Sequence, residues 1–235
     1  MIAIYKRELQ SYFTSMIGCV FIAFFIAMGG LYFMVYNLIN GYTYFSYALY
    51  SVTFFLIVAI PILTMKSFAE EKKNKTEQLL MTAPISLTTI VLGKYLAMAT
   101  IFAIPNLVYC LFPLIIKSYG ISHFVVDYLS IFMYFLLGCV FIAVGMFLSS
   151  LTESQVIAAI ASVGTLYVLY MWEGLVEFIP FTSLQTFLQD KALVSIFSNV
   201  AFNYVFDATG LVIYLSVIGV FIFLTIQTLQ KRRWS

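Results

Sequence analysis

Charged residues are scarce in this sequence. Of its 235 residues, 9% are Asp, Glu, Lys or Arg and 63% are hydrophobic, whereas soluble domains contain about 25% charged and about 45–50% apolar residues. So few charges cannot cover the surface of a water-soluble domain. Several apolar runs are long enough to cross a bilayer as helices, which takes about 20 residues each. The composition predicts an integral membrane protein with a single transmembrane domain over residues 1–235.

Residues that could bind a metal or act as nucleophiles are also few. The chain has one histidine, His123, and three cysteines, which all fall within apolar segments. One histidine without a cysteine pair does not make a metal site, and isolated cysteines in such segments are typical of packing. No G-x-x-x-x-G-K-S/T phosphate-binding loop occurs. We therefore expect no metal, no disulfide framework and no cofactor in this chain, and we do not expect it to be an enzyme.

The apolar runs predict six transmembrane helices. Their approximate limits are residues 16–38, 44–65, 90–116, 128–148, 155–171 and 211–229. The runs are continuously apolar rather than alternating, which excludes the strands of a membrane β-barrel. The predicted fold class is an all-α integral membrane protein with six transmembrane helices, and an even number of spans places both termini on the same side.

Lysine and arginine residues are divided unevenly between the predicted loops. If both termini are cytoplasmic, ten of these residues lie inside and only Lys117 and Lys191 lie outside. Cytoplasmic loops carry the excess of Lys and Arg in membrane proteins, so both termini and the loop at residues 66–86 are predicted to be cytoplasmic. The acidic residues that this topology places outside are interpreted as a solvated rim: Asp127, Glu173, Glu177, Asp190 and Asp207.

The first 13 residues, MIAIYKRELQSYF, predict a short helix that lies in the membrane interface. Apolar and aromatic residues recur at helical spacing and would share one face, while the charged residues would lie on the other. These apolar positions are Ile2, Tyr5, Leu9, Tyr12 and Phe13. The alternative is a frayed polar leader before the first span.

The loop KSFAEEKKNKTEQLLMTAPIS at residues 66–86 concentrates charge in an apolar chain. Asn74 and Glu77 are spaced like a helix N-cap and its reciprocal partner, and Pro84 would end the short helix that follows. Ser86 can cap the helix that enters the third span. The pattern predicts a compact cytoplasmic helix with exposed leucines. From composition alone, an equally open alternative is that the lysines only enforce topology and contact anionic lipid.

The same loop resembles the first cytoplasmic loop of permease subunits of type-2 ATP-binding-cassette (ABC) exporters. The shared pattern is a Phe-Ala-Glu-Glu run, a Thr-x-x-Leu-Leu core, a Thr-Ala-Pro step and a Gly-Lys pair before the third span. Here these are Phe68, Ala69, Glu70, Glu71, Thr76, Glu77, Gln78, Leu79, Leu80, Thr82, Ala83, Pro84, Gly93 and Lys94. The start KRELQSYFTS resembles the amphipathic elbow helix of that family.

The C-terminal part of the chain is similar to the gliding-motility subgroup of these permeases. The segment SIFSNVAFNYVFDATG and the final QKRRW carry this likeness. That subgroup usually has Arg-Gly where this chain has Thr209-Gly210. The resemblance covers nearly the whole chain.

The resemblance implies a separate ATPase partner that holds ATP and Mg. The short cytoplasmic helix of such permeases docks on the ATPase, and the elbow helix helps to transmit movement. Carried onto this sequence, the coupling residues are Phe68, Glu70, Glu71, Thr76, Glu77, Leu79, Leu80 and Pro84, and the elbow residues are Tyr5, Lys6, Arg7 and Glu8. Two ATPase copies, a second permease (the same chain or a relative), membrane lipid and the plasma membrane of a bacterium are implied, with no nucleic acid.

The resemblance also implies a cargo pathway between two permeases, lined by the second and fifth spans. Small or polar residues that could line it, or form a seam between permeases, are Ser51, Ser154, Ala158, Ser162 and Thr165. Small residues let helices approach closely, so ordinary packing within one bundle is the slightly favoured alternative. Residues 173–210 form the predicted external loop, with short re-entrant helices before the last span.

Two other function classes are weighed against an exporter permease. A secondary carrier driven by an ion gradient predicts ionisable residues in the middle of the membrane, and none is found there. A membrane assembly protein without transport activity predicts no cytoplasmic lever. The identity of the cargo, whether peptide, lipid-like molecule or drug, stays open.

Overall fold

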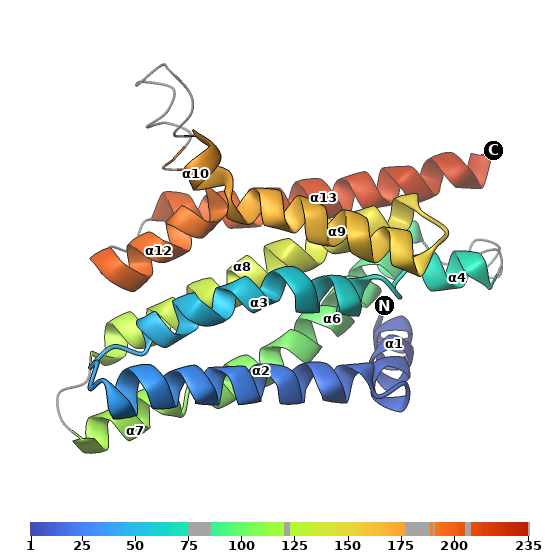
Figure 1. The fold of residues 1–235 in the computed structure, drawn as a ribbon. Coiled ribbons are helices and arrows are strands. Elements are labelled where there is room, and N and C mark those ends of the chain that lie inside the picture. The colour runs from blue at the N-terminus through green and yellow to red at the C-terminus, as the bar shows by residue number, and fades with distance from the viewer. Residues whose placement is uncertain (75–85, 120–122, 177–188, 190, 205–207, 235) are drawn as a thin grey trace.

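The computed structural model describes residues 1–74, 86–119, 123–176, 189, 191–204 and 208–234. Every regular element in these ranges is a helix (Figure 1). The elements are α1 (Ile2–Thr14), α2 (Ile17–Phe33), the π-helix η1 (Met34–Ile39), α3 (Ser46–Thr64), α4 (Ala69–Lys73), α6 (Leu87–Tyr109), α7 (Phe112–Tyr119), α8 (Phe124–Leu151), α9 (Gln155–Tyr170), α10 (Trp172–Val176), α12 (Leu193–Asn203) and α13 (Ala208–Trp234).

Five helical stretches are long and apolar enough to cross a membrane. They are Ile17–Ile39, Ser46–Lys73, Leu87–Ser118, Phe124–Leu151 and Ala208–Lys231. These stretches confirm an all-helical, multi-pass membrane protein and cover five of the six predicted spans.

The remaining predicted span, the fifth at residues 155–171, coincides with α9, which has only 16 residues. A helix of that length extends about 24 Å, less than the hydrocarbon core of about 30 Å. Tyr170 at its end contacts Phe54, two turns into α3, with ring centroids 5.9 Å apart. Beyond that level α12 lies against α3, where Phe202 packs on Tyr50 at 4.8 Å. Two separate helices, α9 and α12, therefore follow one another along α3.

Helix α8 is the centre of the bundle. It packs against α3, α6, α9, α12 and α13, and most of its side chains are buried. At Gly138 an added Cβ would lie 2.0 Å from the ring of Phe102 in α6, so only glycine fits at this crossing. Phe102 in turn packs on Phe25 of α2, with ring centroids 5.8 Å apart. The core is thus a set of aromatic rings between closely packed helices.

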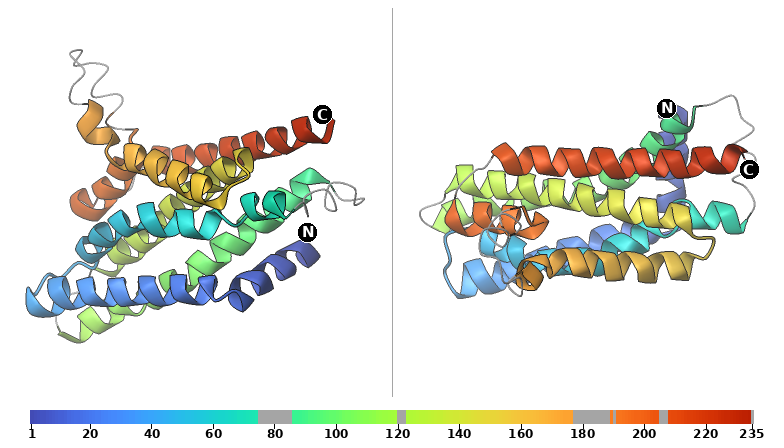
Figure 2. Two further views of the ribbon diagram at one scale, coloured as in Figure 1. Left: turned by 45° about the vertical axis from the view of Figure 1, so that its right-hand side comes forward. Right: turned by 90° about the horizontal axis from the view of Figure 1, so that it is seen from above.

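The bundle has two distinct ends. The N-terminus, α4 and the C-terminus lie at one end, on the right of Figure 1, and we call it the α4 end. Helices α7 and α12 lie towards the opposite end, which we call the α12 end. Figure 2 shows the same arrangement from two other directions. Of the residues expected from the sequence to couple the protein to a partner, Phe68, Glu70 and Glu71 are described, and they lie at the α4 end.

Candidate functional site

Helix α1 is held against the bundle by one face. Its buried residues are Ile4, Glu8 and Tyr12, each four positions from the next. The hydroxyl of Tyr12 donates to the carbonyl of Leu63 at 3.0 Å, and burial raises the pKa of this phenol. Gly93 of α6 admits Ile4, because a Cβ there would lie 3.0 Å from the Ile4 side chain. Helix α1 is therefore attached to α3 and α6.

The predicted division of α1 into an apolar and a charged face does not hold at every position. Ile2, expected on the apolar face, is 71% exposed, whereas Glu8, expected on the opposite face, is buried. A buried carboxylate needs a partner, and one of the two partners of Glu8 comes from another helix. Of the predicted elbow residues, Tyr5 lies 3.1 Å from Thr100 of α6 through their hydroxyl oxygens, and Lys6 is exposed.

Lys94, in the second turn of α6, is the centre of a buried ionic cluster. Its side chain is 2% exposed, and its Nζ lies 2.9 Å from Glu71 Oε1 and 3.1 Å from Glu8 Oε1. The same nitrogen donates to the carbonyl of Ser67 at 2.9 Å and lies 5.3 Å from the centre of the Phe68 ring. These contacts supply the pairing and hydrogen bonds that a desolvated ammonium requires.

Arg7 completes this cluster on its solvent side. Its guanidinium donates to Glu8 Oε1 at 2.7 Å and to Glu71 Oε1 at 3.2 Å. The hydrogen bond to Glu8 raises the pKa of Arg7 further above its ordinary value. Two cations and two carboxylates thus balance one another. We call Arg7, Glu8, Glu71 and Lys94 the Lys94 cluster. It joins α1, α4 and α6, which are far apart in the sequence.

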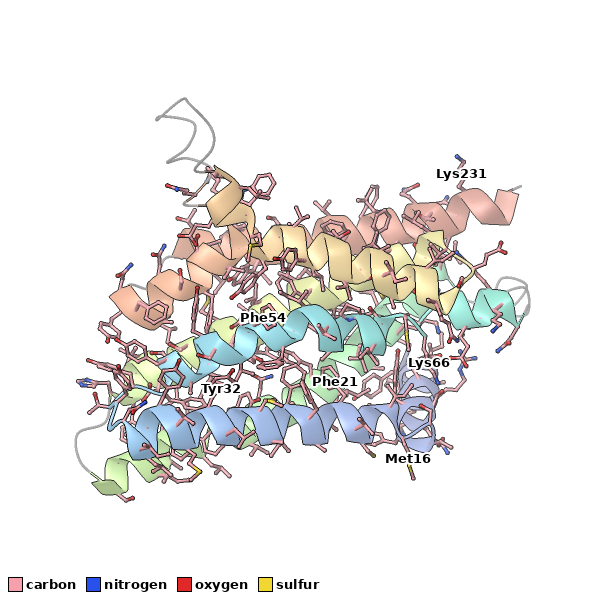
Figure 3. The ribbon with its side chains drawn as sticks, viewed as in Figure 1. Met16, Phe21, Tyr32, Phe54, Lys66 and Lys231 are labelled. Atoms are coloured by element: carbon pink, nitrogen blue, oxygen red, sulfur yellow. The ribbon has the colours of Figure 1, made fainter. Side chains whose placement is uncertain are left out.

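The other predicted coupling residues divide into two groups. Phe68 is buried below the Lys94 ammonium, and Glu70 is partly exposed, 3.9 Å from Lys66; Figure 3 shows Lys66 at the α4 end. Thr76, Glu77, Leu79, Leu80 and Pro84, with the short helix predicted for them, lie outside the described residues. The predicted cap at Ser86 is confirmed, because its Oγ accepts the N–H of Thr89 at 3.4 Å.

The predicted pathway residues lie in different surroundings. Ala158 and Ser162 of α9 are buried within the chain, whereas Ser51 is half-buried and donates to the Tyr36 hydroxyl at 3.2 Å. Thr165 is half-buried and donates to the carbonyl of Ala161, and Ser154 is the N-cap residue of α9. The burial of Ala158 and Ser162 agrees with packing within one bundle. A seam at these residues stays a prediction.

The solvated rim predicted at the outer acidic residues is wrong for Asp127. Its side chain is 0% exposed, and its Oδ1 accepts the N–H of Phe45 at 2.8 Å. Glu173 is exposed, as expected of a rim residue. Glu177, Asp190 and Asp207 lie outside the described ranges.

Sequence reasoning missed the role of Lys94, although it singled out the pair Gly93-Lys94. A signal was present, since a lysine four residues inside a predicted span must find a counter-ion. Within the ranges that the structure describes, no group of three or more His, Cys, Asp and Glu side chains could hold a metal ion.

A bundle of apolar, membrane-length helices with one ionic cluster at its end defines a multi-pass membrane protein. The chain belongs to the ABC-2 family of transporter proteins, whose family model matches residues 2–232. It is therefore a permease component of an ABC transporter, a membrane component without catalytic activity of its own that works with an ATPase partner. No curated protein matches the chain significantly.

Proposed function

We propose that this chain is the permease of an ABC exporter and receives the movement of its ATPase at the α4 end. Two permeases form the cargo pathway, and two ATPase subunits bind ATP and Mg. The observation that carries the proposal is the Lys94 cluster, because it joins α1 to the start of the loop in which the coupling residues lie.

Transmission of movement from an ATPase requires a stiff coupling element. A permease without a phosphate-binding loop has to receive work through contact, and a flexible tether would lose it. Helix α4 leads directly into residues 75–85, and Glu71 on α4 is fixed by Lys94 and Arg7. Removing one partner of such a buried network costs about 3–5 kcal/mol. Displacement of the loop therefore moves α1 and α6 with α4.

The excess of Lys and Arg supports a cytoplasmic α4 end. Lys66, Lys73 and Lys231 lie there with both termini, and cytoplasmic segments carry this excess. In this orientation α1 is the elbow helix in the inner interface, residues 66–86 are the coupling loop, and the protein lies in the plasma membrane of a bacterium. The C-terminal likeness supports a place near the gliding-motility subgroup.

The carrier alternative has one observation in its favour. Asp127 is an ionisable residue buried in a membrane-length helix, and its Oδ2 has no hydrogen-bond partner. Such residues mark proton and ion pathways in carriers. Its other carboxylate oxygen, however, is used by the backbone of α3. Transport that follows an imposed proton gradient without ATP would favour the carrier over the exporter.

The coupling loop provides the direct test. The double variant Leu79→Asp and Leu80→Asp is expected to insert normally and to lose the ATPase that copurifies with the wild-type chain. The matched control places the same pair of aspartates at the exposed residues Lys117 and Ser118, towards the opposite end of the bundle. An ATPase that stays bound to the loop variant, with unchanged ATP turnover, contradicts the proposal.

A further inference from the structure

Helices α3 and α4 begin without capping side chains of their own. The N-cap residue is Phe45 in α3 and Phe68 in α4, and neither helix has a side-chain cap from its own N-cap residue. The first N–H groups of a helix have no partner within that helix, and a buried N–H group without a partner is costly. Because Phe45 and Phe68 are both buried, acceptors have to come from elsewhere in the fold.

Helix α8 provides an acceptor at both places. In its first turn, Asp127 Oδ1 accepts the N–H of Phe45 at 2.8 Å. In its last turn, Ser149 Oγ accepts the N–H groups of Phe68 and Ala69, each at 3.2 Å. The Ser149 hydroxyl also donates to the carbonyl of Met65 at 3.3 Å. A single hydroxyl therefore connects the end of α3, the start of α4 and α8.

The capping at the α4 end is reciprocal. Lys72 of α4 is buried, and its ammonium donates to the carbonyl of Ser150 in the last turn of α8. Cations are favoured at helix C-termini, where carbonyls lack intrahelical partners. Helix α8 thus caps the N-terminus of α4, and α4 caps the C-terminus of α8.

Between these two points α3 and α8 pack closely, and Figure 2 shows them running side by side. A Cβ on Gly145 would lie 2.4 Å from Thr64 Oγ1, so only glycine admits this approach. Asp127 and Ser149 are 22 positions apart, which is about 33 Å along a helix. The two capping points are therefore separated by about the hydrocarbon thickness of 30 Å.

We infer that α3, α4 and α8 form one rigid strut that carries movement of α4 across the bilayer, with Asp127 and Ser149 as the positioning residues at its ends. The origin of that movement rests on the proposed function, but the rigidity is a property of the permease alone. Without the Ser149 hydroxyl, the joint between Met65 and Ala69 loses the three hydrogen bonds that this hydroxyl makes with it, and α4 can bend there.

The α4 end is tested on the permease alone in lipid nanodiscs. Spin labels replace Lys73, exposed at the end of α4, and Val125, 82% exposed at the start of α8, after replacement of the three native cysteines. The wild type is expected to give one narrow distance distribution. Ser149→Ala loses the single narrow peak, and Ser149→Thr, which keeps the hydroxyl, restores it. Ser150→Ala is the matched control, because the Ser150 hydroxyl donates within α8 to Phe147.

The α12 end is tested with labels at Val125 and at Phe54, which is 46% exposed on α3. Asp127→Ala removes the acceptor and is expected to lose the narrow peak, whereas Asp127→Asn keeps a carbonyl oxygen for Phe45 and retains it. Ser130→Ala is the control, because this buried hydroxyl one turn further along α8 has no hydrogen-bond partner. If Asp127→Ala is not recovered in the membrane, the Ser149 variants decide the inference.

Two results would overturn the strut. One is a distribution of Lys73–Val125 label distances that is as narrow in Ser149→Ala as in the wild type, or that Ser150→Ala broadens as much as Ser149→Ala does. The other is a change in the wild-type distance when the ATPase, ATP and vanadate are added, since a rigid strut moves as a whole. Failure of the proposed function is distinguishable: an ATPase that does not bind the chain leaves the distributions of the permease alone unaffected.

Discussion

The two ends of the bundle are held together by different kinds of contact. At the α4 end, charged groups meet at hydrogen-bonding distance around Lys94. Every ion pair between two described residues lies at this end. At the α12 end, aromatic rings stack: Tyr44 lies between His123, at 4.4 Å, and Tyr204, at 4.5 Å.

This difference affects how each end responds to force. Charge-assisted hydrogen bonds fix both distance and direction, whereas offset ring pairs tolerate a range of separations and tilts. The ion pairs at the α4 end can therefore impose a geometry, whereas the ring pairs around Tyr44, apart from the Asp127 cap, can adapt to one. That division agrees with the proposal that the ATPase drives the permease at the α4 end.

The largest expected effect is that of Lys94→Met. It removes the ammonium that the carboxylates of Glu8 and Glu71 share, and breaking a buried ion network in this way costs about 3–5 kcal/mol. Thermal unfolding of the purified permease measures the loss. Lys66→Met is the matched control at a partly exposed pair with a separation of 3.9 Å, where about 1 kcal/mol or less is expected. Equal effects of the two variants would mean that burial of the Lys94 cluster adds nothing to what an exposed ion pair contributes at the α4 end.

A compensating variant sharpens the same measurement. Glu71→Gln in the Lys94→Met background removes one of the two carboxylates that lost the Lys94 ammonium. The double variant is therefore expected to be more stable than Lys94→Met alone, because the cost lies in the unpaired charge rather than in lost attraction. Simple addition of the two single effects would contradict a direct interaction between these side chains.

Much of the fold followed from the sequence, and the exceptions have physical causes. Five spans and α1 were placed by continuous or periodic hydrophobicity, which is a local property. Asp127 was assigned to a solvated loop because the span was expected to begin at residue 128, yet α8 begins at Phe124 and Asp127 lies in its first turn. The true start of a membrane helix is hard to read because hydropathy falls gradually near the interface.

The buried charges were beyond local reasoning for a different reason. Glu8 and Lys94 are 86 positions apart, and neither residue's surroundings reveal the other. That α9 ends before it crosses the membrane can be predicted from the sequence, because residues 155–171 are too few to span about 30 Å as a helix. That α12 continues along α3 depends on tertiary packing at Tyr50 and Phe202, which no local pattern encodes.

At the α12 end the expected effect is intermediate. Tyr44→Ala removes the ring from the two stacked pairs with His123 and Tyr204, each worth about 0.5–1.5 kcal/mol, so about 1–3 kcal/mol of unfolding free energy is expected to be lost. Tyr44→Phe keeps the ring and is expected to lie within about 0.5 kcal/mol of the wild type. Thermal unfolding of both variants makes the comparison. If Tyr44→Phe were as damaging as Tyr44→Ala, the hydroxyl rather than stacking would hold this end.

The smallest effect that still separates the ends is expected for Tyr12→Phe. This variant keeps the buried ring and removes only its hydrogen bond to the Leu63 carbonyl, a change worth about 1 kcal/mol. Because Tyr12 fixes α1 to α3 beside the Lys94 cluster, the combined loss of stability in Tyr12→Phe with Lys94→Met is expected to differ from the sum of the two single losses by a measurable coupling energy. The losses of Tyr12→Phe and Tyr44→Ala, at opposite ends, are expected to add within about 0.5 kcal/mol. Double-variant cycles of thermal unfolding provide both values. Coupling between the opposite ends as large as that within the α4 end would mean that the ionic and aromatic ends do not respond separately.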